Sequence, residues 1–185
     1  MKTIGVPEKA TQERVIKLFT DELGYRFFGD RSDSANSNIW EEYIIAWLKK
    51  NGYSDGQIKR ALEALHRTAD NHHCSLYANN QAVYQLLRYG VSVLADAGEV
   101  FETVHLINWD EPEQNDFAIA EEVTLKGGYE RRPDLVLYVN GIAIGVIELK
   151  NSRVSIGDGI RQNLSNQKPE FNEWFFSTVQ LLFAG

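Results

Sequence analysis

Two acidic residues and a lysine lie at the ends of neighbouring apolar segments. Asp134 directly precedes the segment 135–139, and Glu148 and Lys150 fall at the end of the segment 142–150. Burying charge at such places costs free energy unless something compensates it. Phosphodiester cleavage gives these residues a use, because two carboxylates hold Mg²⁺ and an ammonium stabilises negative charge at the phosphate. The sequence therefore predicts a Mg²⁺-dependent phosphodiesterase centre at Asp134, Glu148 and Lys150.

The spacing at the end of the second segment suits this chemistry. Glu148 and Lys150 are two residues apart, so they point to the same face of a β-strand. Leu149 points to the opposite face, which leaves its main-chain carbonyl oxygen free to act as a third metal ligand. The expected metal ligands are therefore Asp134, Glu148 and Leu149.

The register between the two segments decides whether the acids can meet. Asn140-Gly141 separates them, and Asn-Gly is the strongest short signal for a two-residue hairpin turn. With that turn alone, Asp134 would lie opposite Ile147, on the wrong face for Glu148. A β-bulge or a three-residue turn shifts the pairing by one residue and brings Asp134 opposite Glu148. We therefore expect one of these two irregularities in the hairpin.

The elements that must position these residues differ between the two halves of the chain. Apolar residues recur at helical spacing in the first half, where the polar segment 29–38 has the composition of a loop. Strand-like segments dominate the second half, and 135–139 and 142–149 are apolar on successive residues, as in strands covered on both faces. Helices are expected at 11–24, 39–50, 55–69, 80–97 and 161–168, and strands at 100–108, 117–125, 135–139, 142–149 and 174–183.

These elements predict an α/β fold with a mixed central β-sheet flanked by helices and a helical N-terminal portion. We expect residues 1–70 to form the helical portion and residues 71–185 the core that carries the site. Because the chain stops two residues after an apolar strand, we expect it to be a fragment of a longer protein.

The composition of the chain limits which kinds of partner it can bind. No apolar run approaches the ~18 residues of a membrane span, so we expect no membrane partner, and the single Cys74 agrees with a reducing, cytoplasmic setting. The net charge of −7 argues against a polyanionic partner, yet residues 126–168 carry seven Lys and Arg against four Asp and Glu. This local charge of +3 leaves −10 on the rest of the chain, so the basic residues gather around the predicted site.

The motif Pro133-Asp134 followed by Glu148-Leu149-Lys150 resembles that of the PD-(D/E)xK nuclease superfamily, which has a restriction-endonuclease-like fold. Longer segments resemble the N-terminal nuclease domain of the restriction (motor, R) subunit of type I restriction-modification enzymes. This wider resemblance covers roughly residues 37–185. The segments that carry it are NGYSDGQIKRALEAL, NWDEPEQNDFAIAEE, RPDLVLYVNGIAIGVIELK and GIRQNLSNQKPEFNEWFFSTVQLLFAG.

The resemblance implies endonucleolytic cleavage of double-stranded DNA with Mg²⁺ as cofactor. It implies that ATP is used by a helicase motor that would follow Gly185, since this chain has no phosphate-binding loop of the GxxxxGK[ST] type. Modification and specificity subunits are the implied protein partners. Asp134 and Glu148 would bind the metal, and Lys150 would be the catalytic lysine.

Further site residues follow from the same resemblance. Gln162 falls where related nucleases carry a QxxxY helix motif, but the fifth position is Asn166 instead of Tyr. Gln162 is therefore a candidate to contact the nucleic acid or the lysine, with Gln167 as an alternative. Related nucleases often add a glutamate from an upstream helix, for which Glu41 and Glu42 are the candidates.

Three alternatives stay open. The acids could form a structural salt-bridge network with Arg131, Arg132 or Lys150 and bind no metal. The domain could be a non-catalytic docking module of the same complex, which the acidic remainder of the chain favours. It could also be a repair or recombination nuclease of the same superfamily, which would depend on DNA ends.

Overall fold

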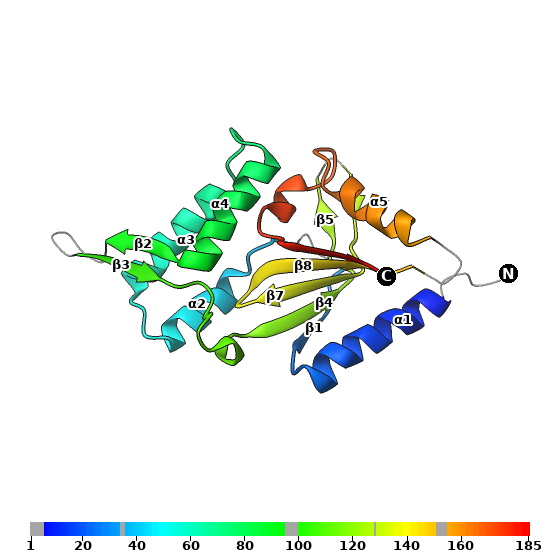
Figure 1. Ribbon diagram of the computed structural model, residues 1–185, viewed down its shortest axis with the longest axis horizontal. Helices are drawn as coiled ribbons and strands as arrows, with labels where there is room; N and C mark the ends of the chain where they lie inside the picture. The colour runs from blue at the N-terminus through cyan, green and yellow to red at the C-terminus, as the bar shows by residue number, and fades with distance from the viewer. Residues whose placement is uncertain (1–5, 34–35, 95–99, 128, 151–154) are drawn as a thin grey trace.

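The protein is described by a computed structural model covering residues 6–33, 36–94, 100–127, 129–150 and 155–185. Its centre is a mixed five-stranded sheet with helices on both sides (Figure 1). The strand order is β1-β4-β7-β8-β9, in which the β1–β4 and β8–β9 pairs are parallel and the two inner pairs are antiparallel. The strands are β1 (Arg26–Asp30), β4 (Phe117–Glu121), β7 (Leu135–Val139), β8 (Ile142–Glu148) and β9 (Leu181–Ala184). This arrangement confirms the predicted mixed α/β fold.

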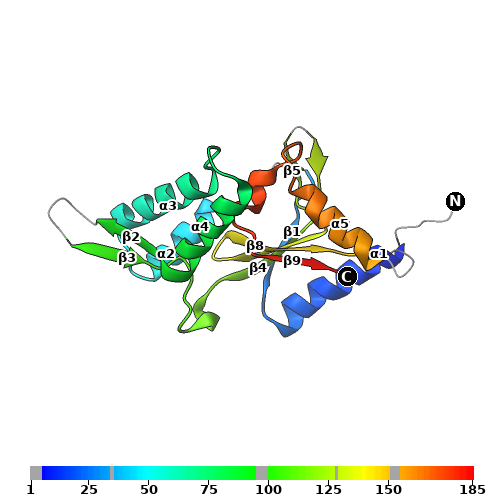
Figure 2. The ribbon, with the colours of Figure 1, turned by 45° about the horizontal axis from the view of Figure 1, so that its top comes forward.

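Both faces of the sheet are covered, as the unbroken apolar character of β7 and β8 predicts. Residues of one parity along the strands, including Leu135 and Ile147, pack against α1 (Val6–Lys17) and the short helix η1 (Leu18–Glu22). Residues of the other parity, including Tyr138, pack against the 3₁₀ helix η3 (Glu173–Ser177) and its surroundings. The helix α5 (Ile156–Asn166) packs against β8 and β9 on this second side, as Figure 2 shows. The hairpin that carries the predicted site is therefore enclosed from both sides.

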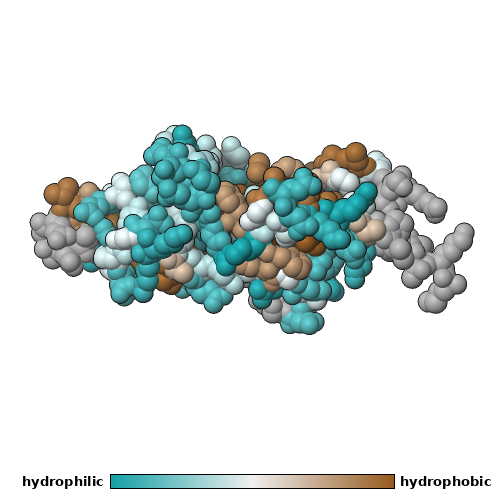
Figure 3. All heavy atoms as spheres, turned by 90° about the horizontal axis from the view of Figure 1, so that it is seen from below, coloured by the Kyte–Doolittle hydropathy of each residue, from teal (hydrophilic) through white to brown (hydrophobic). Residues whose placement is uncertain are grey.

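A second core lies at the turn end of the β7–β8 hairpin. It is built from α2 (Glu41–Lys50), α3 (Asp55–Ala69), α4 (Leu76–Tyr89) and the hairpin of β2 (Val91–Leu94) and β3 (Phe101–Val104). Val139 and Ile142 from the central sheet join this core and connect the two parts. On the face in Figure 3, hydrophilic residues cover most of this helical part, whereas hydrophobic residues gather nearer the middle of the molecule.

The helix α3 spans the predicted residues 55–69, because its start is fixed by a capping box. The Gln57 main-chain N–H donates to Ser54 Oγ at 3.3 Å, and the Gln57 side chain accepts from the Ser54 N–H at 2.8 Å. The fourth helix is shorter than predicted. It ends at Tyr89 because Gly90 adopts a positive φ of 81°, and residues 91–94 form a strand instead of a helix. The rest of that predicted helix, up to Ala97, lies outside the described residues.

Other boundaries also differ from the prediction. The predicted final strand, 174–183, begins as η3, and only residues 181–184 pair with β8. The predicted strand 117–125 breaks at Glu122, whose φ is 51°, and resumes as β5 (Leu125–Lys126), which pairs with β6 (Glu130–Arg131).

The loop predicted at 29–38 overlaps β1, a strand that the sequence did not reveal. It pairs in parallel with β4 at the edge of the sheet, so a segment from the first 70 residues contributes to the central sheet. The division of the chain at residue 70 stays a prediction. Within the described residues, no helix is long and apolar enough to cross a bilayer.

Candidate active site

The β7–β8 hairpin begins with a tight turn. Val139 pairs with Ile142, so the turn has two residues, and both Asn140 (φ 52°) and Gly141 (φ 83°) lie in the left-handed region that such a turn requires. The close approach of α2 also requires glycine, because a Cβ atom on Gly141 would lie 2.7 Å from the carbonyl oxygen of Trp40.

A β-bulge then corrects the register, as predicted. The pairing shifts between Leu137 and Tyr138, where Ile144 is the extra residue of the opposite strand. From there the register runs to Leu135 opposite Ile147, and its continuation places Asp134 opposite Glu148. The bulge, and not a longer turn, brings the two acids together at the end of the hairpin that is far from the turn.

Main-chain contacts fix Asp134. The Leu149 N–H donates to Asp134 Oδ2 at 2.6 Å, which ties the carboxylate to the opposite strand. The main-chain oxygen of Asp134 accepts from the Glu122 N–H at 3.0 Å and from Gln12 Nε2 of α1 at 3.4 Å. The carboxylate therefore sits where α1, the end of β4 and the hairpin meet.

Glu148 is fully buried and held from α5. Gln162 Nε2 donates to its Oε2 and Asn166 Nδ2 to its Oε1, each at 2.8 Å. The ammonium nitrogen of Lys150 lies 3.9 Å from Oε2, and the lysine side chain is 16% exposed. The helix can approach closely because position 159 is glycine, where a Cβ atom would lie 3.1 Å from that of Ala184.

The surroundings of Glu148 disfavour the charged form of its side chain. Burial raises the pKa of Glu148 to about 8, and the nearby Asp134 carboxylate adds to the rise. The Lys150 charge and the hydrogen bond from Asn166 oppose it. Two carboxylates whose charges repel in a buried place would both be stabilised as anions by a divalent cation.

The donor set fits a hard cation such as Mg²⁺, which prefers oxygen ligands and commonly takes only one or two carboxylates from the protein. In the described part of the chain, no three side chains of His, Cys, Asp or Glu gather as a metal site. Beyond Asp134 and Glu148, the coordination shell would therefore have to come from main-chain, water or phosphate oxygens. The carbonyl of Leu149, which follows Glu148 and whose N–H donates to Asp134, is the main-chain candidate.

An acidic pocket of about 470 Å³ opens beside Asp134. Burial, followed by the charges of Asp30 and Glu122, raises the pKa of Glu121 in this pocket. The pocket is lined by Lys9, Gln12, Asp30, Glu121, Glu122, Arg132 and Asp134. The sequence prediction missed Gln12, Glu121 and Glu122, although two adjacent acids in the strand predicted to precede Asp134 were a usable signal.

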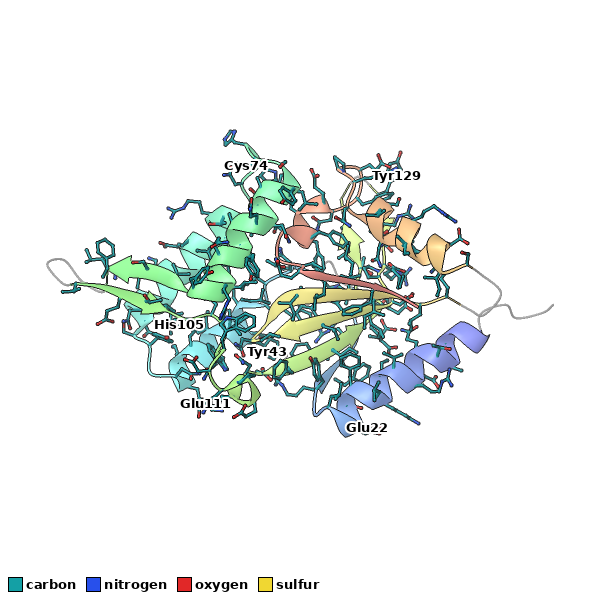
Figure 4. The ribbon with its side chains drawn as sticks, in the orientation of Figure 1. Glu22, Tyr43, Cys74, His105, Glu111 and Tyr129 are labelled. Atoms are coloured by element: carbon teal, nitrogen blue, oxygen red, sulfur yellow. The ribbon has the colours of Figure 1, made fainter. Side chains whose placement is uncertain are left out.

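The structure does not bring the predicted upstream glutamates to the site. Glu41 lies 2.8 Å from His66 Nε2, and the preceding Trp40 N–H donates to the Gly141 carbonyl at 2.8 Å. Both contacts belong to the turn end of the hairpin, where Figure 4 labels Tyr43, and the C-terminus marks the opposite end. Glu41 and Glu42 fall here because α2 packs on the turn. From α1, by contrast, Gln12 Nε2 donates to the main-chain oxygen of Asp134.

Two further candidates also contact other groups. Gln162 Nε2 donates to Glu148, while Gln167 Nε2 donates to the Asn163 carbonyl of its own helix at 3.1 Å. A contact of Gln162 with the nucleic acid or the lysine stays a prediction. Arg131 lies over the Phe171 ring at 4.1 Å, and Arg132 pairs with Glu130 at 3.6 Å. Among the residues that the structure describes, Lys150 is the basic residue found within ion-pair distance of Glu148. Arg153, part of the predicted basic segment, lies outside the described residues.

Residues 6–185 match the protein family described as the type I restriction enzyme R protein N terminus. The chain is also similar to the type I restriction enzyme HindI endonuclease subunit of Haemophilus influenzae, with 34% identity over 115 residues. That alignment covers 59% of this chain but 11% of the Haemophilus subunit, so the chain spans a small part of this relative's length.

Proposed function

The chain belongs to the family of type I restriction enzyme R protein N termini, and from this premise we propose that it is a Mg²⁺-dependent endonuclease unit that cleaves double-stranded DNA. The observation that carries the proposal is the bulged hairpin, which brings Asp134 opposite Glu148, with the ammonium nitrogen of Lys150, just past the end of β8, 3.9 Å from Glu148 Oε2. A buried carboxyl group with a strongly raised pKa beside a second carboxylate, as Glu148 is beside Asp134, is typical of functional sites. We assign the three residues to the PD-(D/E)xK motif.

In the proposed mechanism, Asp134, Glu148 and the Leu149 carbonyl would hold Mg²⁺. The ion would supply a lowered pKa for its bound water and partial neutralisation of the scissile phosphate. Gln162 and the Leu149 N–H orient the two carboxylates through their hydrogen bonds. Lys150 presents an ammonium at the edge of the site, where it can stabilise the negative charge that develops on the phosphate.

The proposed setting is a larger complex. Modification and specificity subunits would find the target sequence, and an ATP-driven motor would deliver DNA to this unit. With a net charge of −7, the unit alone should bind DNA weakly at physiological salt, because affinity rests on phosphate neutralisation by Lys and Arg. A domain that depends on a motor for its substrate can tolerate this weakness.

The test is nicking or linearisation of supercoiled circular DNA at low salt, with and without Mg²⁺. Cleavage that requires Mg²⁺ and disappears in Lys150→Ala supports the proposal. Lys49→Ala is the matched control, because Lys49 pairs with Asp55 at 3.0 Å on the exposed surface of the helical part. Equal activity in Lys150→Ala and the wild type would reject the assignment, and activity on linear DNA alone would favour an end-dependent nuclease.

A second candidate function is a non-catalytic docking module, favoured by the charge of −10 on the chain outside residues 126–168. An acidic surface suits protein partners better than DNA. Association with modification and specificity subunits that persists in a protein without metal binding would favour this candidate.

A further inference from the structure

The helix α5 places two amide side chains against a single carboxylate. Gln162 and Asn166 are four residues apart, so they share one face of the helix, and each donates to a different oxygen of Glu148 at 2.8 Å. A carboxylate held at both oxygens cannot rotate about its terminal bond without breaking a hydrogen bond. The helix thus fixes both the position and the plane of the Glu148 carboxylate.

We propose that Asn166 is a positioning residue that orients Glu148 for binding a divalent cation. Asn166 occupies the position that is Tyr in the QxxxY motif of related nucleases. Here its amide Nδ2 donates to the second oxygen of the Glu148 carboxylate. The proposal deepens the proposed function and rests on it in one respect, namely that Glu148 binds a metal. Asn166 acts through Glu148 and does not itself touch the metal or the DNA.

The burial of Asn166 supports a role beyond packing. The residue is 1% exposed, and its Oδ1 has no hydrogen-bond partner in the part of the chain that the structure describes. A buried amide with one unsatisfied group destabilises a protein relative to an apolar residue of similar size. The described contact that offsets this burial is the hydrogen bond to Glu148.

The contacts that hold α5 against β9 support the same conclusion. Asn163 Nδ2 donates to the Phe183 carbonyl at 2.7 Å, and Gly159 allows close contact with Ala184. These contacts hold the helix to β9 independently of Glu148. The two amides are therefore presented from a fixed element, which is what precise orientation of a metal ligand requires.

The first test is the Mn²⁺ affinity of Asn166→Ala, measured by calorimetry on folded protein. Partners that orient a metal ligand typically contribute about 10–100-fold to affinity, and we expect a loss in that range. The matched control is Asn79→Ala, which removes another buried asparagine, one that donates to the Ala69 and Asn71 carbonyls at 3.2 and 3.1 Å. The control should bind Mn²⁺ like the wild type. Unchanged affinity in Asn166→Ala, or an equal loss in both variants, would overturn the proposal.

A second measurement does not require metal binding. In urea unfolding without metal, Asn166→Ala and Glu148→Ala should each shift the midpoint, and the double variant should shift it by less than their sum, because both groups of the broken contact are gone. Additive shifts would overturn the positioning role. If the wild type binds no Mn²⁺ while the shifts are non-additive, the proposed metal centre fails and the Asn166–Glu148 contact is structural. That outcome also rejects the proposal, because it shows that Glu148 binds no metal even though Asn166 does contact Glu148.

Discussion

The two ends of the β7–β8 hairpin bury polar residues in contrasting ways. At the turn end, Asn140 is fully buried, its Nδ2 donates to the Leu106 carbonyl and Asn115 Oδ1 at 2.9 Å each, and its Oδ1 accepts from the Asp116 N–H at 2.7 Å. At the open end, Glu148 is equally buried and also hydrogen-bonded, yet its pKa is raised to about 8 because burial and Asp134 disfavour its charge.

This difference distinguishes a buried residue that stabilises the fold from one with a proposed functional role, although both lie in the same hairpin. A neutral group with its hydrogen bonds made stabilises the turn. A carboxylate buried opposite another carboxylate is destabilising where its charge is only partly offset, as that of Glu148 is by Lys150, so we look to function to explain its presence. Satisfied hydrogen bonds alone do not distinguish the two cases, whereas the raised pKa of Glu148, which Lys150 offsets only in part, does.

The largest expected effect is at the open end. Glu148→Gln keeps the shape of the side chain and removes its charge, so it should lower Mg²⁺-dependent cleavage of circular DNA by about 10³-fold, in the range for loss of one charge-stabilising group at a reaction centre. Thermal unfolding should show a midpoint no lower than that of the wild type, because the buried charge is gone. Normal cleavage by Glu148→Gln would show that the charge of Glu148 is not needed for the reaction, so the two ends of the hairpin would not differ in role.

The turn end should respond in the opposite sense. Asn140→Ala leaves the Leu106 carbonyl and the Asp116 N–H without their side-chain partner and places alanine at a positive φ, so the free energy of unfolding should fall by about 3 kcal/mol. Urea unfolding measures this loss. Because glycine tolerates a positive φ, Asn140→Gly should lose less stability than Asn140→Ala. The Mn²⁺ affinity of the folded fraction should not change. Loss of affinity without loss of stability would contradict the structural role.

The pH dependence of stability sharpens the comparison. Because the pKa of Glu148 is raised from 4.5 to about 8 on folding, the folded protein binds more protons than the unfolded chain between these values. The free energy of unfolding should therefore decrease as pH rises across this window, by up to about 1.4 kcal/mol per pH unit. Urea unfolding at pH 5, 6, 7 and 8 without metal tests this.

Glu148→Gln provides the reference for the pH series. The difference in the free energy of unfolding between the wild type and this variant should become independent of pH at low pH, where Glu148 is protonated in both states. Asn140→Gly should retain the full wild-type dependence. An identical pH profile for wild type and Glu148→Gln would show that the charge at the open end is compensated after all.

The smallest expected effect concerns the upstream acids near the turn. Glu41→Ala removes an exposed contact with His66, and exposed ion pairs contribute about 0–1 kcal/mol. Cleavage and Mn²⁺ affinity should stay within twofold of the wild type, measured by the same nicking and calorimetric assays. A hundredfold loss in either would place Glu41 in the site, contrary to the structure.

The sequence predicted the hairpin well because its signals were local. Asn140-Gly141 defined the turn, and the requirement that Asp134 and Glu148 share a face predicted either a β-bulge or a three-residue turn. The structure has the bulge, at Ile144. The helix predicted at 55–69 also has the predicted bounds, and the structure shows that the capping pair Ser54 and Gln57 fixes its start. The two turn residues are adjacent and the two capping residues are three positions apart, while Asp134 and Glu148 belong to the two arms of one hairpin.

The missed features depend on tertiary contacts. β1 is a five-residue edge strand whose pairing with β4 joins segments about 90 residues apart, and its sequence carries no alternation that separates it from a loop. Gln12 reaches Asp134 over 122 positions. The role of Asn166 was hidden because the sequence showed only a departure from a motif, while the structure shows the carboxylate that it contacts.

The most direct test of the metal centre is Mn²⁺ binding by calorimetry to the wild type, Asp134→Ala and Glu148→Ala, because it depends on neither DNA affinity nor partner subunits. The account predicts binding in the wild type and its loss in both variants, with all three proteins folded. Absence of binding in the folded wild type at millimolar Mn²⁺, or binding that survives either substitution, would contradict the claim that the open end of this hairpin is a metal site.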